Sequence, residues 1–300
     1  MQTSFSEFDI DHARRLIRLA REEDLGPHGD VTTQLLPPHI SGASGMWHVT
    51  ARAEGRFCGR DLLPLLLEEL APEIRLEWCE PGAVPLDVRP GDRIARLSGL
   101  VGQMLSAERT ILNFLQHPSG IATLPPGFVS PVAGTHANIY DTRKTMPGLR
   151  SLEKYAVRCG GGHNHRTGLY DAVLLKDNHL AGIPTQRLAH AVFEMLNQLE
   201  SLPQRPAFVE VECDGLDQFT ELLKVVGINV ILLDNFEPAD LCEAVELRNS
   251  QGLRGKVELE ASGGATLDSV RQIAETGVDR IAVGAITHSA PILDLGLDAA

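Results

Sequence analysis

The chain has 300 residues, of which 43% are hydrophobic and 22% charged, and its formal net charge is −13 at pH 7. This length allows one large α/β domain or two smaller ones with an ample core. The acidic balance argues against a nucleic-acid partner, which would require a broad basic surface, and no apolar run is long enough to span a bilayer.

The cysteines and the N-terminal residues indicate a cytoplasmic protein. The first 24 residues are amphipathic and lack a continuous apolar segment, which is not the pattern of a secretory signal. Widely spaced cysteines without a CxxC pair are typical of reduced thiols in the cytosol. The five are Cys58, Cys79, Cys159, Cys213 and Cys242.

The first elements are helical and then mixed. Apolar residues recur at helical spacing over 9–23, and Asp9 or Asp11 is expected to cap this helix. Helices are also expected over 62–70 and 101–116, and Pro118 is expected to end or kink the second of these. Short strands separated by Gly, Pro and Asp predict an antiparallel sheet with a helix on it. The strand regions are 47–53, 57–59, 74–80 and the hairpin-like 88–100.

From about residue 137 onward, short apolar runs alternate with helical stretches. This alternation predicts parallel strands in either a barrel or a doubly wound sheet. The expected strands are 137–141, 172–176, 207–212, 230–234, 257–262 and 280–284. The expected helices lie near 149–159, 184–200, 216–226, 238–249 and 266–276.

Polar residues or glycines follow each of these strands, where an α/β barrel places its active site. One charged residue after a strand is commonplace, because the chain meets solvent there, but six consecutive strand ends of this kind favour a common site. They are Thr142–Lys144, Lys176, Glu212, Asp234, Ser262–Gly264 and Gly284–Ala285.

The stretch 141–179 is a basic island in an acidic chain. It has a net charge of +3, so the other 261 residues carry −16. A local cluster of cations in an acidic protein is what a site for a small polyanion requires. The cations are Arg143, Lys144, Arg150, Lys154, Arg158, Arg166 and Lys176.

These cations differ in what they recognise. Arg143 and Arg166 offer planar forks for a carboxylate or phosphate, whereas Lys144 and Lys176 act as point charges. The glycines at 160–162, 263–264 and 284 are suited to phosphate-binding loops, although each also fits an ordinary turn.

Acids on two apolar strands complete the candidate site. Glu212 and Asp234 are suited to binding sugar hydroxyls, holding Mg²⁺ directly or through water, or stabilising a positive transition state. Glu210 and Glu212 share a face by the two-residue period of a strand, so spacing leaves open which of them acts.

Other sites are less favoured. His163, His165 and His179 suggest zinc, but no CxxC or HExxH accompanies them. The chain has no P-loop, and no GxGxxG follows a strand at the right place, so an NTPase or Rossmann dehydrogenase is not supported.

The stretch 141–179 resembles the signature region of the quinolinate phosphoribosyltransferase family. Further motifs follow the family in order and spacing, so that the resemblance covers nearly the full chain. They are REEDLGPHGDVTT (21–33), SAERTILNFLQHPSGIAT (106–123), VEVECDGLDQF (209–219), ILLDNFE (231–237) and residues 259–298.

The resemblance implies a two-domain α/β fold. Residues 1–115 would form an N-terminal α/β sandwich, joined by the returning segment 288–300, and residues 116–287 an open α/β barrel. It also implies a homodimer, or a larger assembly of such dimers, in which the N-terminal domain of one subunit completes the active site of its partner.

The resemblance further implies the reaction: quinolinate and phosphoribosyl pyrophosphate give nicotinate mononucleotide, pyrophosphate and CO₂, with Mg²⁺, in NAD biosynthesis. Lys176, Glu212 and Asp234 would be catalytic, and the two acids would also face the metal. Substrate would be held by Arg109 from the partner, Thr142, Arg143, Lys144, His165, Arg166 and Lys176. The 5′-phosphate would be bound by Ser262, Gly263, Gly264, Val283, Gly284 and Ala285.

Three departures from the family pattern stand out: Pro118, the proline-containing segment 124–134 and His163. Alternatives with the same or a similar fold are a paralogue linked to molybdenum transport, a phosphate-binding aldolase or isomerase, and a non-enzymatic binding protein. Arg109 together with the cations of 142–144 and 164–166 disfavours the paralogue, because those groups fit a dicarboxylate. Lys176 is followed by Asp177 and accompanied by other cations, unlike a lone Schiff-base lysine, which disfavours the aldolase. No acid or cation is missing from the strand ends, as a binding protein would predict.

Overall fold

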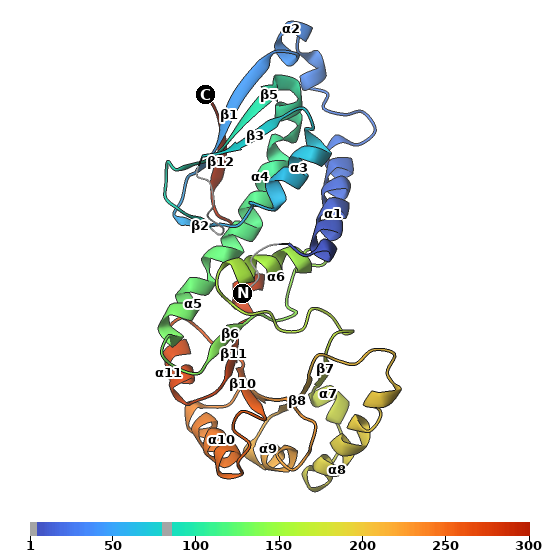
Figure 1. Ribbon diagram of the computed structural model, residues 1–300, viewed down its shortest axis with the longest axis vertical. Coiled ribbons are helices and arrows are strands. Elements are labelled where there is room, and N and C mark those ends of the chain that lie inside the picture. Colours follow the sequence, from blue (N-terminus) through green and yellow to red (C-terminus); the bar gives the residue numbers. More distant parts are fainter. Residues whose placement is uncertain (1–4, 80–85) are drawn as a thin grey trace. The chain divides into compact units, whose positions relative to one another are not determined.

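A computed structural model describes residues 5–79 and 86–300, which form two compact units (Figure 1). Glu80, at the end of the expected strand 74–80, lies outside the described residues. The first unit comprises residues 1–125, 145–161 and 286–300, and the second comprises 126–144 and 162–285. The sequence-based division instead assigned 116–125 and 145–161 to the barrel domain.

The first unit contains an antiparallel sheet in the order β12-β1-β5-β3 and a separate pair, β2-β4. The strands are β1 (Ser44–Ala51), β2 (Gly55–Phe57), β3 (Arg75–Trp78), β4 (Leu86–Val88), β5 (Arg93–Leu100) and β12 (Leu295–Ala299). The helices are α1 (Glu7–Leu25), η1 (Thr33–Leu35), α2 (Pro38–Ser41), α3 (Leu62–Leu70), α4 (Val101–Thr123) and α6 (Arg150–Cys159).

The expected helices and antiparallel sheet of this unit are confirmed, but two local predictions are wrong. The cap of α1 is Ser6, whose side chain accepts from the backbone N–H of Asp9 while Asp9 accepts from the N–H of Ser6. Residues 88–100 do not form a hairpin, because β4 pairs with β2 whereas β5 pairs with β1 and β3.

Helix α4 continues through Pro118 to Thr123, so of the two outcomes expected for this proline, an end or a kink, the helix end does not occur. Pro118, Ser119 and Gly120 are buried, and this burial offsets the missing backbone hydrogen bond. Gly120 permits this approach, since a Cβ at that position would lie 1.9 Å from the carbonyl oxygen of Pro291. The continuous α4, with α6 packed on it, explains why 116–125 and 145–161 belong to the first unit.

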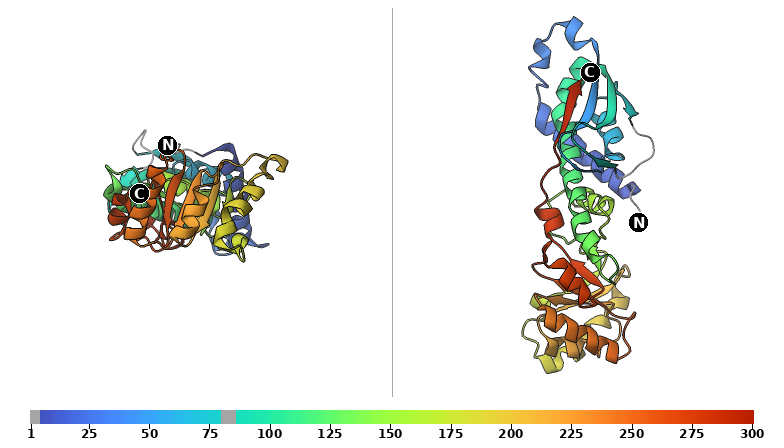
Figure 2. Two further views of the ribbon diagram at one scale, coloured as in Figure 1. Left: turned by 90° about the horizontal axis from the view of Figure 1, so that it is seen from below. Right: turned by 90° about the vertical axis from the view of Figure 1, so that its left-hand side faces the viewer.

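The C-terminal segment joins the sheet of the first unit, where β12 runs antiparallel to β1. In the right panel of Figure 2 the red C-terminal strand lies beside the blue strand β1. The apolar core of this unit gathers buried side chains from α1, α3, α4 and the sheet, among them Ile17, Val49, Leu66, Leu97 and Ile111.

The second unit is built on six parallel strands in the order β6-β11-β10-β9-β8-β7. They are β6 (Asn138–Tyr140), β7 (Val173–Leu175), β8 (Val209–Cys213), β9 (Val230–Asp234), β10 (Glu258–Ser262) and β11 (Arg280–Ala282). The helices are α5 (Pro125–Val132), α7 (Asp177–Leu180), α8 (Thr185–Leu196), η2 (Leu199–Ser201), α9 (Leu216–Leu222), α10 (Pro238–Ser250), α11 (Val270–Glu275) and α12 (Ala285–His288). α5 begins at the last residue of the first unit, and α12 runs from the second unit into the first.

The alternating strands and helices of the second unit confirm the expected open α/β barrel, in which β6 and β7 are the edge strands. Strand β8 is buried along its whole length, as an interior strand of a parallel sheet covered on both faces is expected to be. The proline-containing segment 124–134 forms helix α5 despite Pro131 in its interior. Within the described residues, no helix combines the length and apolarity needed to cross a membrane.

Candidate active site

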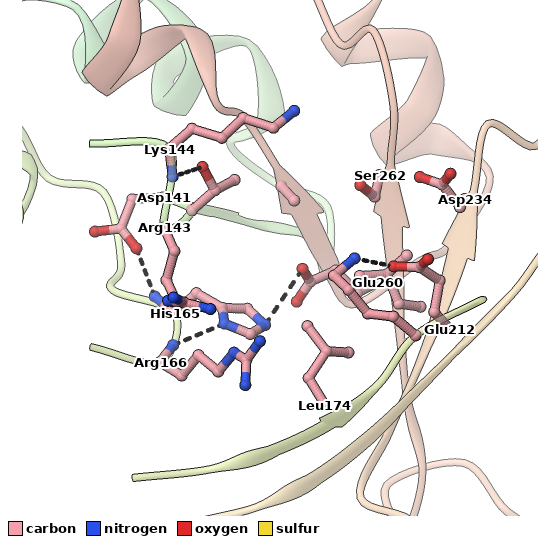
Figure 3. A pocket seen from close by; sticks show the side chains of 14 residues that line it. Asp141, Arg143, Lys144, His165, Arg166, Leu174, Glu212, Asp234, Glu260 and Ser262 are labelled. Carbon is pink, nitrogen blue, oxygen red and sulfur yellow. Dashed lines mark hydrogen bonds and ion pairs between the residues drawn. The ribbon is translucent and has the colours of Figure 1, made fainter. Parts of the chain in front are cut away.

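A pocket of about 460 Å³ opens at the carboxyl ends of the parallel strands (Figure 3). All the residues that line it belong to the second unit. Nine of them were predicted from the sequence: Thr142, Arg143, Lys144, His165, Arg166, Lys176, Glu212, Asp234 and Ser262. Five were not predicted as site residues: Asp141, Leu174, Leu232, Glu260 and Ala282.

One wall of the pocket is cationic and is held together by Asp141. This fully buried residue follows β6 and precedes the Thr142–Lys144 segment. Its carboxylate accepts hydrogen bonds from the backbone N–H of His165 and from the side chain of Asn164, both at 2.7 Å. Asp141 therefore ties the loop carrying His165 and Arg166 to the strand end carrying Arg143 and Lys144.

The ring of His165 is engaged by the protein on both sides. Nδ1 accepts a 2.7 Å hydrogen bond from the backbone N–H of Arg166, and Nε2 lies 2.6 Å from Oε2 of Glu210. An Nδ1 that accepts is unprotonated, so Nε2 carries the proton and donates to Glu210. His165 lines the pocket as predicted, but its ring nitrogens hold the loop in place.

Arg166 is only 8% exposed, so its charged side chain lies in a largely buried position. Burial lowers its pKa, and the nearby charge of Arg143 lowers it further. Two guanidinium groups this close repel each other and lose solvation, so a bound anion that pairs with both would stabilise the wall.

The opposite wall carries acids and one lysine. Lys176, at the end of β7, forms an ion pair with Glu212 of β8. Asp234 ends β9, and burial, with a smaller effect from Glu212, raises its pKa. The predicted catalytic residues Lys176, Glu212 and Asp234 thus line one pocket.

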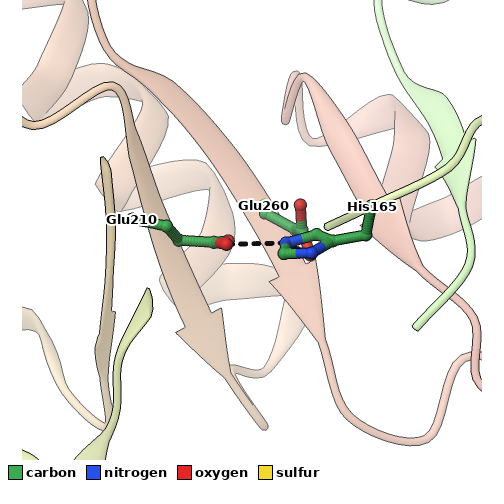
Figure 4. Close-up of side chains that lie close together, drawn as sticks. All are labelled: His165, Glu210 and Glu260. Carbon is green, nitrogen blue, oxygen red and sulfur yellow. Dashed lines mark hydrogen bonds and ion pairs between the residues drawn. The ribbon is translucent and has the colours of Figure 1, made fainter. Parts of the chain in front are cut away.

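Two further acids, Glu210 and Glu260, are buried beside His165 (Figure 4). One oxygen of each carboxylate and a ring nitrogen of His165 all lie within 4.8 Å of one another. Burial raises the pKa of both acids to about 8, and for Glu260 the Glu210 carboxylate adds to the effect. The two-residue period that relates Glu258, Glu260 and Ser262 was the signal in the sequence that could have identified Glu260.

The glycine loop after β10 has a left-handed backbone conformation that favours glycine. Gly263 and Gly264 have φ of +101° and +63°, and a Cβ on Gly263 would lie 2.1 Å from Oδ1 of Asn235. Asn235 donates from its backbone to the carbonyl of Ser262 and from its side chain to Asp234, both at 2.8 Å. Of the predicted phosphate-binding residues, Ser262 lines the pocket, whereas Gly263, Gly264, Val283, Gly284 and Ala285 lie outside its lining.

Arg109 is exposed on α4 of the first unit and does not line the pocket. The three histidines considered for zinc do not form one site in the described residues. His163 stacks on Tyr140, while Nδ1 of His179 accepts from the backbone of Lys176. The described side chains contain one set of three with metal-ligand spacing, His165, Glu210 and Glu260, and there the protonated Nε2 disfavours coordination.

Comparisons with known proteins agree across the chain. Family models described as the N-terminal and C-terminal domains of quinolinate phosphoribosyl transferase match residues 30–119 and 121–298. A nicotinate-nucleotide pyrophosphorylase [carboxylating] of Mycobacterium leprae is 41% identical and covers 98% of this chain and 99% of its own. A probable one of Bacillus subtilis is 36% identical over 92% of this chain and 89% of its own.

Solved structures extend the likeness to the fold. The nicotinate-nucleotide pyrophosphorylase of Francisella tularensis superposes with a TM-score of 0.85 at 37% identity, covering 100% of this chain and 99% of that one. The corresponding structure from Ehrlichia chaffeensis gives 0.82 at 35% identity, with coverage of 95% and 98%. With both domain models matched and relatives similar over their full length, the chain belongs to the quinolinate phosphoribosyl transferase family.

Proposed function

We propose that this protein transfers the phosphoribosyl group of phosphoribosyl pyrophosphate to quinolinate and releases pyrophosphate and CO₂, giving nicotinate mononucleotide for NAD biosynthesis. One observation carries the proposal: a single pocket has a wall of cations facing a wall of acids. The cations suit a dicarboxylate, and the acids suit a sugar that becomes positively charged during transfer. The molybdenum-transport alternative is not favoured, because the relatives are carboxylating pyrophosphorylases.

The cationic wall would bind the two carboxylates of quinolinate. Arg143 and Arg166 offer forked donors, Lys144 adds a point charge, and Thr142 adds a hydroxyl. This binding would fix the orientation of the ring nitrogen, which must meet the anomeric carbon of the ribose. Holding two reactants in line lowers the entropic part of the barrier.

The acidic wall would act on the ribose. As the bond to pyrophosphate breaks, positive charge builds at the anomeric carbon, and the carboxylates of Glu212 and Asp234 would stabilise it. Lys176 would contact substrate while it holds the Glu212 carboxylate in place. After transfer the ring nitrogen is positively charged, so it stabilises the electron pair that stays on the adjacent carbon when CO₂ departs.

The 5′-phosphate of the donor would be bound at the ends of β10 and β11. Ser262 supplies a hydroxyl on the lining, and a Cβ on Gly264 would meet no atom within 4 Å, so there is open space beside this glycine. The loop Val283–Ala285 follows the adjacent strand, in the part of barrels where phosphate sites commonly form.

Mg²⁺ would enter with the pyrophosphate group of the donor. Glu212 and Asp234 fit such an ion because they provide carboxylate oxygens on one pocket wall, and Mg²⁺ commonly binds one or two carboxylates plus substrate phosphates. Because Glu212 also pairs with Lys176, its carboxylate would contact the Mg²⁺ ion either directly or through a water molecule. The ion would neutralise charge on the leaving group.

The active unit would be a homodimer, alone or within a larger assembly, in which Arg109 of each subunit completes the cationic wall of its partner. Support comes from its exposure on α4 and from a guanidinium without an ion pair among the described residues. We also place the enzyme in the cytoplasm, which suits its five free cysteines.

The proposed function is tested by incubating the purified protein with phosphoribosyl pyrophosphate, Mg²⁺ and either quinolinate or nicotinate. We expect equal amounts of nicotinate mononucleotide, pyrophosphate and CO₂ from quinolinate, and a kcat/KM for nicotinate lower by about a hundredfold or more. Comparable rates with nicotinate, or no product from quinolinate, would contradict the proposal.

A further inference from the structure

Glu260 is a buried acid on the pocket lining that no step described above uses. It is 1% exposed, and its Oε2 has no hydrogen-bond partner among the described groups. The nearest cation is Arg280, whose Nη1 lies 4.0 Å from that oxygen. The guanidinium of Arg280 already pairs with Glu258 and lies over the ring of Tyr140. An acid left in this state loses solvation without gaining a partner.

The hydrogen bonds around His165 indicate which of the two neighbouring acids holds a proton. The ring is neutral and donates from Nε2 to Glu210, which favours the ionised form of Glu210. Glu260 lies 3.7 Å from the same nitrogen and receives no hydrogen bond. Two buried carboxylates separated only by a neutral ring cannot both ionise at low cost. Glu260 is therefore the member of the pair that stays neutral.

The position of Glu260 matches the reacting ring carbon. In Figure 3 its carboxyl group lies between His165 on the cationic side and Glu212 on the acidic side. The carbon that loses CO₂ has the ribosylated nitrogen on one side and the carbon bearing the second carboxylate on the other. With the nitrogen toward the acids and the carboxylates toward the cations, as proposed above, this carbon would lie over the region that Glu260 lines.

We propose that Glu260 is the general acid that protonates this ring carbon, an inference that rests on the proposed function. The bond between the carbon and its carboxylate breaks, CO₂ leaves, and the electron pair stays on the carbon beside the positive nitrogen. That pair takes the proton of the Glu260 carboxyl group as the bond breaks, so CO₂ release is slow without the acid. Glu260 becomes a carboxylate beside Glu210, and a proton from solvent restores its neutral form.

The electrostatic surroundings agree with this role. The groups that face Glu260 are Glu210 on β8, His165 on the loop before β7, Arg280 on β11 and Asp141 after β6. Burial and the charges of Glu210 and Asp141 raise its pKa to about 8, against the opposing charge of Arg280. The pKa of Glu210 is raised as far, so it is the hydrogen bond from His165 to Glu210 that leaves Glu260 as the neutral acid that donation requires.

The test follows one turnover of the full-length enzyme with Mg²⁺, phosphoribosyl pyrophosphate and quinolinate labelled in the carboxylate that leaves. Pyrophosphate and CO₂ are measured in the same quenched samples. In Glu260→Gln, we expect pyrophosphate formation within about threefold of wild type but CO₂ release slower by about thirtyfold or more, with a dicarboxylated nucleotide accumulating. Glu260→Asp, which keeps a carboxyl group, should recover part of the CO₂ rate.

Further measurements distinguish a loss of proton transfer from a loss of folding stability in Glu260→Gln. Glutamine has the shape of neutral glutamic acid, so the thermal midpoint should stay within a few degrees, as it should in Glu275→Gln, an exposed control on α11. Wild-type CO₂ release should decline above about pH 8, and Glu260→Gln should lose that decline. Equal slowing of pyrophosphate and CO₂, or CO₂ release within about twofold of wild type, would overturn the proposal. Absence of any wild-type product from quinolinate would instead refute the proposed function and, with it, the inference.

Discussion

Arg166 donates its backbone N–H to Nδ1 of the preceding residue, His165, at 2.7 Å. This contact sets the tautomer of the ring, directs Nε2–H at Glu210 and fixes the backbone from which the Arg166 guanidinium extends. The geometry of the cationic wall therefore depends on a ring that need not touch substrate. A sequence search for charged residues does not reveal this role of His165, because the ring acts by positioning the neighbouring residue Arg166.

Replacing His165 with alanine should destabilise the protein as well as the site. The change leaves Glu210 buried without its donor and the Arg166 N–H without its acceptor. We expect the free energy of unfolding to fall by about 2–4 kcal/mol in urea titrations. His190→Ala, on the exposed side of α8, should change it by less than about 0.5 kcal/mol. A His165 effect as small as that of the control would show that the ring is not a structural anchor.

Much of the barrel and its pocket could be predicted because parallel strands are nearly continuous apolar runs and their carboxyl ends meet at one edge. The pairing of β2 with β4 could not, since β4 and β5 look like a hairpin locally while their partners are distant in sequence. Likewise, the continuation of α4 through Pro118 depends on tertiary burial rather than on local propensity.

How deep each acidic side chain lies within the barrel also could not be predicted from the sequence. The strand period places Glu210 and Glu212 on one face, but only the register against neighbouring strands separates them. Glu212 lines the pocket with Lys176, whereas Glu210 lies beneath it against His165. Glu260 was not predicted as a site residue for the same reason. Its neighbour His165 is about a hundred residues earlier in the sequence and comes close to it only in the folded chain.

Lys176→Ala should remove most of the activity while leaving the fold intact. The side chain is 44% exposed, so its loss creates no cavity, but Glu212 loses its cation and gains repulsion from Asp234. We expect kcat/KM for quinolinate to fall by about a hundredfold. Lys224→Ala, which breaks an exposed ion pair with Glu221, is the matched control and should keep wild-type kinetics. A value within about twofold of wild type for Lys176→Ala would contradict its catalytic assignment.

Asp30 should make the first unit sensitive to acid. Hydrogen bonds from Thr33, Ser106 and Thr32 lower its pKa to about 2, so it favours folding above its unfolded pKa near 4. This stabilisation should disappear as the pH falls from about 4 to 2. At neutral pH, Asp30→Asn should reduce the unfolding free energy by about 1 kcal/mol, after allowing for solvent screening.

Urea titrations at several pH values measure this effect. The difference between wild type and Asp30→Asn should shrink toward zero near the acid end, and Thr33→Val, which removes one donor to the carboxylate, should show a smaller difference of the same sign. A difference that stays constant with pH would mean that the charge of Asp30 is not what stabilises the folded state.

Gly263→Ala should weaken binding of the phosphoribosyl donor. Its φ is +101° and the new Cβ would meet Asn235 at 2.1 Å, so the loop after β10 must shift. We expect KM for phosphoribosyl pyrophosphate to rise by about tenfold and stability to fall by about 1–3 kcal/mol. Gly252→Ala carries a similar backbone strain at φ +67° with nothing within 4 Å, and should lose only about 1 kcal/mol of stability with KM unchanged. Equal kinetic effects of the two substitutions would remove the loop from the phosphate site.

The shared-site proposal predicts that two impaired variants, assayed at quinolinate well below KM, restore activity in each other. Arg109 belongs to the first unit and Lys176 to the second, and only Lys176 lines the pocket. If the partner supplies Arg109, a mixed dimer of Arg109→Ala and Lys176→Ala has both defects in one site and none in the other. Random exchange of equal amounts makes half of the dimers mixed, so activity should recover to about one quarter of wild type.

The experiment mixes the two purified variants, allows subunit exchange and follows product formation with time. Arg109→Ala alone should raise KM for quinolinate by about tenfold or more, because one guanidinium contact to a carboxylate is lost. Mixing Arg109→Ala with wild type should give only the average of the two, which controls for dilution. Recovery no greater than the sum of the separate variants would place both residues in the site of one subunit, and the guanidinium of Arg109 would then have to act within its own chain.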